Sequence, residues 1–206
     1  MRRNKDRASG TFVLDYRVRT LADGFGDEEW LTQIAAPQLK ALHRHLVWPT
    51  ALATPAGDAM YVRLTTSLIS PLALDRVPVG YRVPILASAV GLACFAFMPE
   101  KVRQTVREML VCLDGPDAEF ARNRKLVQSM VAQTRKRGYA IRVRGFNRRT
   151  SSIAVPILRQ GRALASLNVS WHHAAMPLDE AVRRFLAPLR TTAAQIGTDL
   201  AARLRS

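Results

Sequence analysis

The sequence predicts an α+β fold in which helices flank a largely antiparallel sheet. Strand-like and helix-like segments occur in clusters along the chain, a grouping typical of antiparallel sheets with segregated helices. Residues 150–171 hold two apolar runs around a tight polar turn, as a β-hairpin does. With 206 residues, 48% of them hydrophobic, the chain is long enough for one globular domain and an appendage.

The strands are predicted by alternating apolar residues between turn signals. The first is short, because only Phe12, Leu14 and Tyr16 alternate beside a basic turn, and it looks like half of a hairpin. Residues 50–66 hold a Pro-Ala-Gly-Asp turn between two apolar runs and predict a strand–turn–strand unit. Further strands are expected at 70–77, at 138–144 and in the hairpin of 150–171.

The helices of the N-terminal half are predicted by their apolar spacing and by the residues at their ends. The first begins at the acidic residues 27–29, and Pro37 either kinks it or starts a second helix. A tightly packed helix rich in alanine and glycine starts near Ser88, and an amphipathic helix follows Pro99.

Two more helices are expected in the C-terminal half. The first has Asp117 as its N-cap and Gly138 as its stop. The second closes the chain after Pro177. Its apolar positions are Leu178, Val182, Phe185, Leu186, Leu189, Ile196, Leu200 and Leu204.

Charge is strongly positive and unevenly placed. The net charge is +15, and residues 135–162 hold nine Lys or Arg and no acid. Residues 21–60 instead hold two basic and five acidic residues. The basic stretch indicates either a nucleic acid or other anionic partner, or a compositional bias toward arginine on solvated faces.

Several classes of protein find no support in the sequence. The longest apolar stretch, 86–98, is shorter than the ~18–20 residues of a membrane span, and no secretory signal is present. We therefore expect a soluble, cytoplasmic protein without a membrane partner, whose thiols are reduced. No spacing matches a metal site, a phosphate loop or a catalytic nucleophile, so we expect no enzyme, no metal and no cofactor. The residues considered were Cys94, Cys112, His43, His45, His172 and His173.

The second run of the hairpin has an unusual pair of faces. Side chains two apart in a strand share a face. One face is apolar and the other carries only small, uncharged hydrogen-bonding groups: Leu167, Val169 and Trp171 against Ser166, Asn168 and Ser170. Burying such groups without partners costs about 1–3 kcal/mol each. A cavity holding water or a small polar ligand would satisfy them, and so would hydrogen bonds to neighbouring loops.

Four segments together resemble the effector-binding domain of IclR-family transcriptional regulators. They are "VGYRVPILASAVGLACFAFMPE", "RKRGYAIRVRGFN", "SSIAVPILRQGRALASLNVS" and the closing amphipathic helix, and the similarity runs from about Leu21 to Arg205. "GFGDEEW", "VWPT", "DAMYVR" and "SSIAVP" look most similar to the subgroup that activates 3-hydroxyphenylpropionate degradation.

The resemblance implies a GAF-like domain with a curved, largely antiparallel sheet of about six strands flanked by helices. It also implies a pocket at one face of the sheet for a small carboxylate effector, which we expect to be aromatic. The helix start would offer backbone N–H groups to the carboxylate, as helix N-termini do for anions, and the hairpin would line the same pocket. The expected site residues are Ser88, Ala89, Val90, Ser152, Asn168 and Ser170, with Tyr61 and Phe146 as apolar walls.

The sequence departs from the family pattern in two places. The acidic pair that many members carry before the hairpin is absent, and the region instead holds Arg142, Arg144, Arg148 and Arg149. These arginines either fit a larger or more anionic effector or face solvent. At the N-terminus, residues 1–22 look like the last wing hairpin and linker of a winged helix-turn-helix, while 23–206 look like the effector domain.

The resulting expectation is the ligand-sensing domain of a DNA-binding regulator of a catabolic operon. DNA would be bound through a winged helix-turn-helix that is missing from this chain. Family members pair, and the stripe of Trp30, Ile34 and Leu42 offers apolar surface, so a homodimer or homotetramer is expected. The alternative function is that of a basic nucleic-acid-binding protein with no small-molecule effector.

Overall fold

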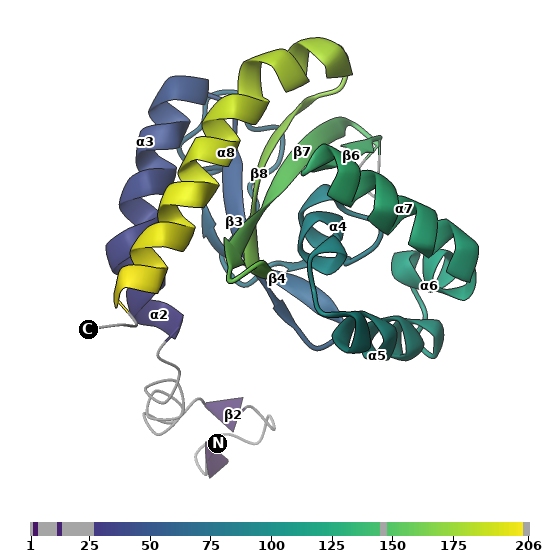
Figure 1. Ribbon diagram of the computed structural model, residues 1–206. Helices are drawn as coiled ribbons and strands as arrows, with labels where there is room; N and C mark the ends of the chain where they lie inside the picture. The colour runs from purple at the N-terminus through teal and green to yellow at the C-terminus, as the bar shows by residue number, and fades with distance from the viewer. Residues whose placement is uncertain (1, 4–11, 14–26, 145–147, 204–206) are drawn as a thin grey trace.

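A six-stranded antiparallel sheet organises the chain in the computed structural model. The structure describes residues 2–3, 12–13, 27–144 and 148–203. The strands lie in the order β5-β4-β3-β8-β7-β6, and the sheet is curled (Figure 1). Their bounds are β3 Thr50–Ala56, β4 Ala59–Thr65, β5 Arg82–Val83, β6 Ala140–Val143, β7 Thr150–Arg159 and β8 Arg162–His172.

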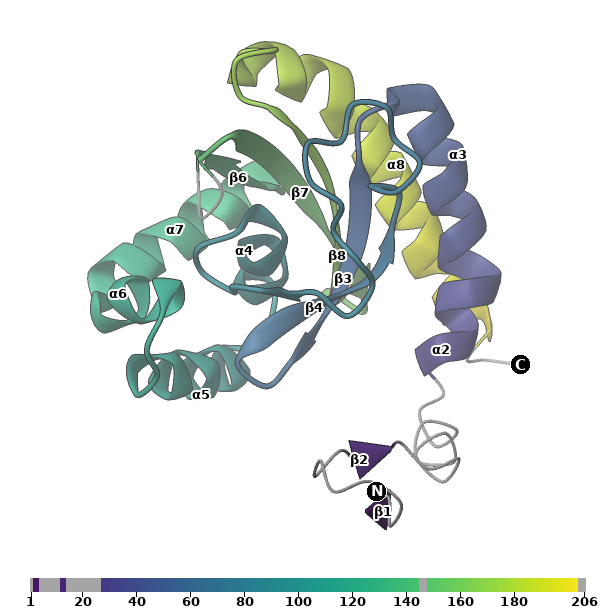
Figure 2. The same ribbon diagram turned by 180° about the vertical axis from the view of Figure 1, so that it is seen from behind.

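Helices cover both faces of this sheet. α3 and α8 lie side by side on one face, and α4 lies against the other, with α5, α6 and α7 farther out (Figures 1 and 2). The bounds are α2 Asp27–Trp30, η1 Leu31–Ala35, α3 Ala36–Leu46, α4 Ala89–Ala96, α5 Glu100–Val111, α6 Pro116–Arg122, α7 Arg124–Arg137 and α8 Leu178–Arg203. The predicted α+β class and the curved antiparallel sheet are confirmed.

The two faces of β8 meet different cores, as its alternation requires. Leu167, Val169 and Trp171 are buried among the side chains of α3 and α8. The opposite face of the sheet packs against α4, and its apolar neighbours, such as Ala53 and Ala154, belong to a second buried cluster. The small polar side chains of β8 therefore face α4.

The first helical segment is continuous through Pro37, with a change of winding just before it. Pro37 lies in the first turn of α3. The preceding turn is the π-helix η1, and the Ala36 N–H donates to Leu31 O across it. The helical run does not break at the proline, and the new element, α3, begins at Ala36, one residue before it.

The apolar stripe of this segment is covered by the chain itself. Trp30 and Leu42 are 7% and 4% exposed and belong to the core formed with α8 and the sheet, and Ile34 packs against that core. The stripe is therefore not the partner surface that we expected. The prediction of a homo-oligomer loses this support and rests on the family resemblance.

Residues 70–77, predicted as a strand, form turns instead. Serine side chains take the place of a neighbouring strand: Ser67 Oγ donates to Val77 O and accepts from Val77 N, at 2.9 and 3.0 Å. Ser70 Oγ donates to Val47 O at 2.8 Å. The alternating leucines of this loop misled the prediction, because hydroxyl groups rather than a strand partner hold its backbone.

Asp117 is not an N-cap, and the helix predicted over 117–138 is two helices. α6 begins after Gly115, and α7 begins after Asn123, whose Oδ1 accepts from Leu126 N at 3.0 Å. Gly138 ends α7 as predicted, in the left-handed conformation with φ 75° and its N–H bonded to Thr134 O. The buried carboxylate of Asp117 has another use, described below.

The remaining expected elements lie near the ends of the chain. β1 Arg2–Arg3 and β2 Phe12–Val13 pair antiparallel, as a hairpin does, whereas Leu14, Tyr16 and Leu204 lie outside the described residues. The closing helix α8 runs where it was predicted and contains Pro188. Among the helices described, none is both long enough and apolar enough to cross a bilayer.

Candidate functional site

A cavity of about 140 Å³ lies between the N-terminus of α4, the sheet and the loop before β5. The structure brings six of the predicted site residues together in its lining: Ser88, Ala89, Val90, Ser152, Asn168 and Ser170. Tyr61 does not line it, and Phe146 lies outside the described residues.

The first turn of α4 lines one side of this cavity. Ser88 caps the helix, because its Oγ accepts from Gly91 N at 3.0 Å while donating to Pro84 O at 2.6 Å. The N–H groups of Ala89 and Val90 come earlier in the turn and have no intrahelical acceptor. Since both residues line the cavity, unpaired donors and the positive end of the helix dipole meet there.

Gly91 allows the segment before α4 to lie against the helix. A Cβ at this position would lie 2.3 Å from Ile85 O and 2.5 Å from Pro84 O. Such distances are far below a van der Waals contact, so only glycine fits this approach. The close packing fixes where the first turn of α4 lies relative to the sheet.

A buried carboxylate holds the same segment from the other side. Asp117 accepts hydrogen bonds from the N–H groups of Ile85, Leu86 and Ala87 at 2.5, 2.8 and 2.8 Å. Three donors to one ionised carboxylate make a strong anchor. Sequence reasoning missed this role because an aspartate two residues after Gly115 also suits a helix N-terminus.

Arg142 is turned inward beside this anchor. Its guanidinium donates to Leu86 O and lies 5.6 Å from the centre of the Phe120 ring. Burial lowers the pKa of Arg142, and the charge of Asp117 opposes that shift. Arg142 therefore supports the segment behind α4, and its charge is not part of the cavity lining.

The sheet supplies the polar wall of the cavity. Asn168 Nδ2 donates to Ser170 Oγ at 3.0 Å, and Ser152 lies opposite Ser170 in the β7–β8 pairing. Small residues flank Asn168 on both sides, because Ala51 and Ala154 are its cross-strand neighbours. In the part of the chain that the structure describes, the Ser152 hydroxyl makes no hydrogen bond.

Ser166 shares the polar face but does not reach the cavity. It is fully buried against the thiol of Cys94 in α4. Burial raises the pKa of Cys94 to about 12. The Ser166 hydroxyl has no hydrogen-bond partner among the described residues. The predicted cavity is found for two of the three polar residues, because Asn168 and Ser170 line it. Ser166 fits neither alternative, since it packs against α4 without a hydrogen-bond partner among the described residues.

Tyr61 was misplaced because β4 contains a bulge. Leu52 pairs with Leu64, but Ala53 pairs with Val62, so Arg63 is an extra residue. The bulge moves Val62 onto the α4 face, where it lines the cavity. The two-residue alternation expected of a regular strand gives no sign of such an extra residue.

The loop before β5 and its neighbours complete the cavity with groups that the sequence did not single out. Leu72, Leu74 and Val77 are apolar walls, and Thr50, Thr65, Ser67 and Tyr81 add hydroxyl groups. The charged or titratable lining includes Asp75 and His172, and none of the lining residues that the structure describes is a lysine or arginine. The loop residues were missed because the segment was predicted to be a strand.

The four arginines near the hairpin do not form a basic pocket wall. Arg142 points into the structure as described, and Arg144, Arg148 and Arg149 are exposed. None of the four lines the cavity. The expectation of a more anionic effector therefore loses its support, and the other expectation, that arginines here face solvent, holds for these three.

The histidines have separate surroundings. His43 lies near Trp48 O, at 3.4 Å, and His173 Nδ1 is 2.9 Å from Ser151 Oγ. Within the described residues, no three His, Cys, Asp or Glu side chains gather closely enough to hold a metal ion. His172 lines the cavity.

Comparison with known proteins identifies relatives of this chain. The chain is similar to the HTH-type transcriptional regulator XynR of Escherichia coli K12, at 24% identity over 142 residues. That match covers 68% of this chain and 52% of XynR, so the chain spans about half of its length.

Solved structures share the fold. An IclR homolog from Microbacterium hydrocarbonoxydans, complexed with 4-hydroxybenzoate, matches with a TM-score of 0.74 and 24% identity, covering 96% of this chain and 79% of that one. A double mutant of the inducer-binding domain of the transcription factor PobR from Acinetobacter, in complex with 3-hydroxybenzoic acid, matches with a TM-score of 0.65 and 19% identity, covering 80% of this chain and 96% of that one.

The family model of the bacterial transcriptional regulator IclR C-terminal domain matches residues 27–198. This range begins at α2 and ends within α8, so it includes the whole sheet and the cavity. The chain therefore belongs to the IclR family of bacterial transcriptional regulators, of which it contains the C-terminal domain.

Proposed function

We propose that this domain senses a small aromatic carboxylate and that the whole protein is a DNA-binding regulator of a catabolic operon. The main support for this proposal is that the first turn of α4 and the polar face of β8 line the same cavity. The proposal also assigns residues 1–22 to the remnant of a wing and residues 23–206 to the sensing domain. The antiparallel pairing of β1 with β2 supports the first assignment.

The carboxylate would bind at the N–H groups of Ala89 and Val90. Among the described residues, no lysine or arginine lines the cavity, so anion recognition would fall to these N–H groups and to the helix dipole. A hydroxyl substituent at the other end of the ligand would meet Asn168, Ser170 and Ser152. These side chains can both donate and accept, which suits a phenol.

The size of the cavity supports an aromatic ring. Its volume of about 140 Å³ is close to that of an apolar cavity, about 150 Å³, known to hold benzene. The two solved relatives with hydroxybenzoates show that this fold accommodates such ligands in those proteins. Within the aromatic carboxylates, the subgroup resemblance favours hydroxyphenylpropionates, which carry the carboxylate on a longer arm.

Calorimetric titration of the Asn168→Leu variant tests the assignment. The ligands are hydroxybenzoates, hydroxyphenylpropionates and short keto acids. Loss of a buried hydrogen bond to the ligand costs about 1–3 kcal/mol, so we expect affinity for the preferred aromatic carboxylate to fall about 5- to 150-fold.

The matched control is Gln133→Leu, which makes a similar change at an exposed position of α7, where the side chain bonds, among the described residues, only to Ser129 and Arg137 of the same helix. Arg190 would be a poor control, because it donates to Arg137 O and packs over the Tyr139 ring. Equal affinity of wild type and Asn168→Leu for every ligand would disprove the assignment. Preference for a short keto acid over the aromatic acids would disprove the proposed ligand class.

A further inference from the structure

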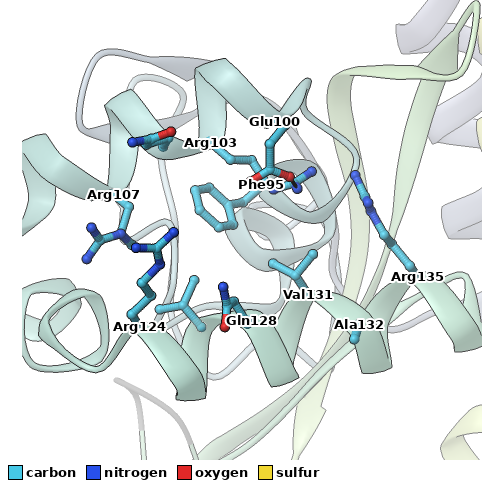
Figure 3. Close-up of a pocket in the computed structure, with 11 residues that line it drawn as sticks. Phe95, Glu100, Arg103, Arg107, Arg124, Gln128, Val131, Ala132 and Arg135 are labelled. Carbon is cyan, nitrogen blue, oxygen red and sulfur yellow. Dashed lines mark hydrogen bonds and ion pairs between the residues drawn. The ribbon is translucent and has the colours of Figure 1, made fainter.

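A second cavity lies on the outer side of α4 and is lined by arginines. It has a volume of about 400 Å³ and runs between α5 and α7, with Phe95 of α4 at its floor (Figure 3). Its walls are two facing helical stripes. α5 contributes Glu100, Arg103, Gln104 and Arg107, and α7 contributes Arg124, Val127, Gln128, Val131, Ala132 and Arg135. We call it the arginine cleft.

At one end of the arginine cleft, Arg103 and Arg135 bind carbonyl groups of the protein itself. Arg103 donates to Met98 O at 2.8 Å and pairs with Glu100, and Arg135 Nε donates to Ala96 O at 2.6 Å. These bonds satisfy carbonyl groups at the C-terminus of α4. Burial lowers the pKa of Arg103, and the charge of Arg135 adds to that shift. The positive charge of this end is thus only partly balanced, by Glu100.

At the other end, Arg107 and Arg124 have no ion-pair partner among the residues that the structure describes. Arg107 donates to Ala121 O at 3.0 Å, which is a neutral acceptor. Arg124 makes no hydrogen bond or ion pair with any described residue. Figure 3 shows the Arg107 and Arg124 side chains at the same end of the cleft. Like charges placed together on a cavity wall favour an anion between them.

The position of Arg124 strengthens this point. It is the first residue of α7, where the positive end of the helix dipole disfavours a cation. Stability of the helix therefore gives no reason for an arginine here. A bound anion would interact favourably with both guanidinium groups and with the helix terminus.

We propose that the arginine cleft binds a small organic phosphate. The phosphate group would lie between Arg107 and Arg124, and the apolar part of the ligand would lie on Phe95, Val127 and Val131. A phosphate monoester carries a charge of about −1.5 to −2 near pH 7, which matches two arginines better than a carboxylate does. Arginine also donates in a planar fork that suits phosphate oxygens. The site is separate from the cavity at the N-terminus of α4 and does not depend on its ligand.

Phenyl phosphate is a suitable probe, titrated into the full chain by calorimetry. We expect saturable binding that Arg124→Gln weakens about tenfold or more, because charged hydrogen bonds are lost. The control is Lys125→Gln, which removes the same charge from the next, exposed residue of α7 and lies outside the cleft. The affinity of Lys125→Gln for phenyl phosphate should lie within about twofold of that of wild type, the usual variation among surface variants. Asn168→Leu should bind phenyl phosphate as tightly as wild type.

Further ligands make the outcome decisive. Inorganic phosphate and benzoate should each bind more weakly than phenyl phosphate, because each lacks one half of the recognised group. No saturable binding at about 1 mM phenyl phosphate, or equal losses in Arg124→Gln and Lys125→Gln, would overturn the proposal. A larger loss of affinity for duplex DNA than for phenyl phosphate in Arg124→Gln would also overturn it and assign the cleft to nucleic acid.

Discussion

Replacing Asp117 by asparagine is expected to destabilise the domain by about 2–4 kcal/mol. The carboxylate accepts three main-chain hydrogen bonds, two at Oδ1 and one at Oδ2. In Asp117→Asn the amide oxygen can keep the bonds from Leu86 and Ala87, although a neutral acceptor makes them weaker. The new NH₂ group then faces the N–H of Ile85, which loses its acceptor. A buried donor left unpaired costs about 1–3 kcal/mol, and the loss of charge assistance adds to it.

Urea unfolding followed by circular dichroism measures this effect. The midpoint should fall without a change in slope, because the extent of the unfolded surface stays the same. Since small domains have about 5–15 kcal/mol of stability in total, the shift is large enough to measure. Glu119→Gln is the control, because Glu119 is exposed on the same helix and should change stability by no more than about 0.5 kcal/mol. An Asp117→Asn variant within about 0.5 kcal/mol of wild type would refute the anchoring role.

Two further predictions concern α4. Gly91→Ala should cost about 1–3 kcal/mol or more in urea unfolding, because the added Cβ would overlap Ile85 O; unchanged stability would show that the two segments can separate freely. In native protein at pH 8, about one thiol per chain should react with Ellman's reagent, namely that of exposed Cys112. Cys94 should not react, because burial raises its pKa to about 12. Urea should expose the second thiol, and two rapid equivalents from native protein would contradict this burial.

The sheet and most helices could be predicted from the sequence, because their signals are local. The two faces of β8 follow from period-two alternation, and the end of α7 follows from a glycine in the left-handed conformation. The residues 88–90 and the polar residues of the hairpin were placed in one pocket by family resemblance. Their meeting in one cavity is a tertiary fact that no local pattern contains.

The errors came from interactions that carry no periodic signal. The bulge at Arg63 changes the face of β4, and serine hydroxyls hold the backbone of 70–77 where a strand partner was expected. Asp117 sits where an N-cap is common but bonds to a segment some 30 residues away in the chain. The stripe of the first helix is amphipathic whether its partner is another copy or the chain's own core, so sequence alone does not decide between them.

Binding of a carboxylate at the first turn of α4 is tested most directly by amide chemical shifts. Uniformly ¹⁵N-labelled protein would be titrated with 4-hydroxybenzoate and, separately, with 3-hydroxyphenylpropionate. We predict saturable downfield shifts of the Ala89 and Val90 amide protons for at least one of the two, because their N–H groups acquire a charged acceptor. Saturable binding that leaves both amides unshifted, or that shifts only residues of the arginine cleft, would contradict the proposed site.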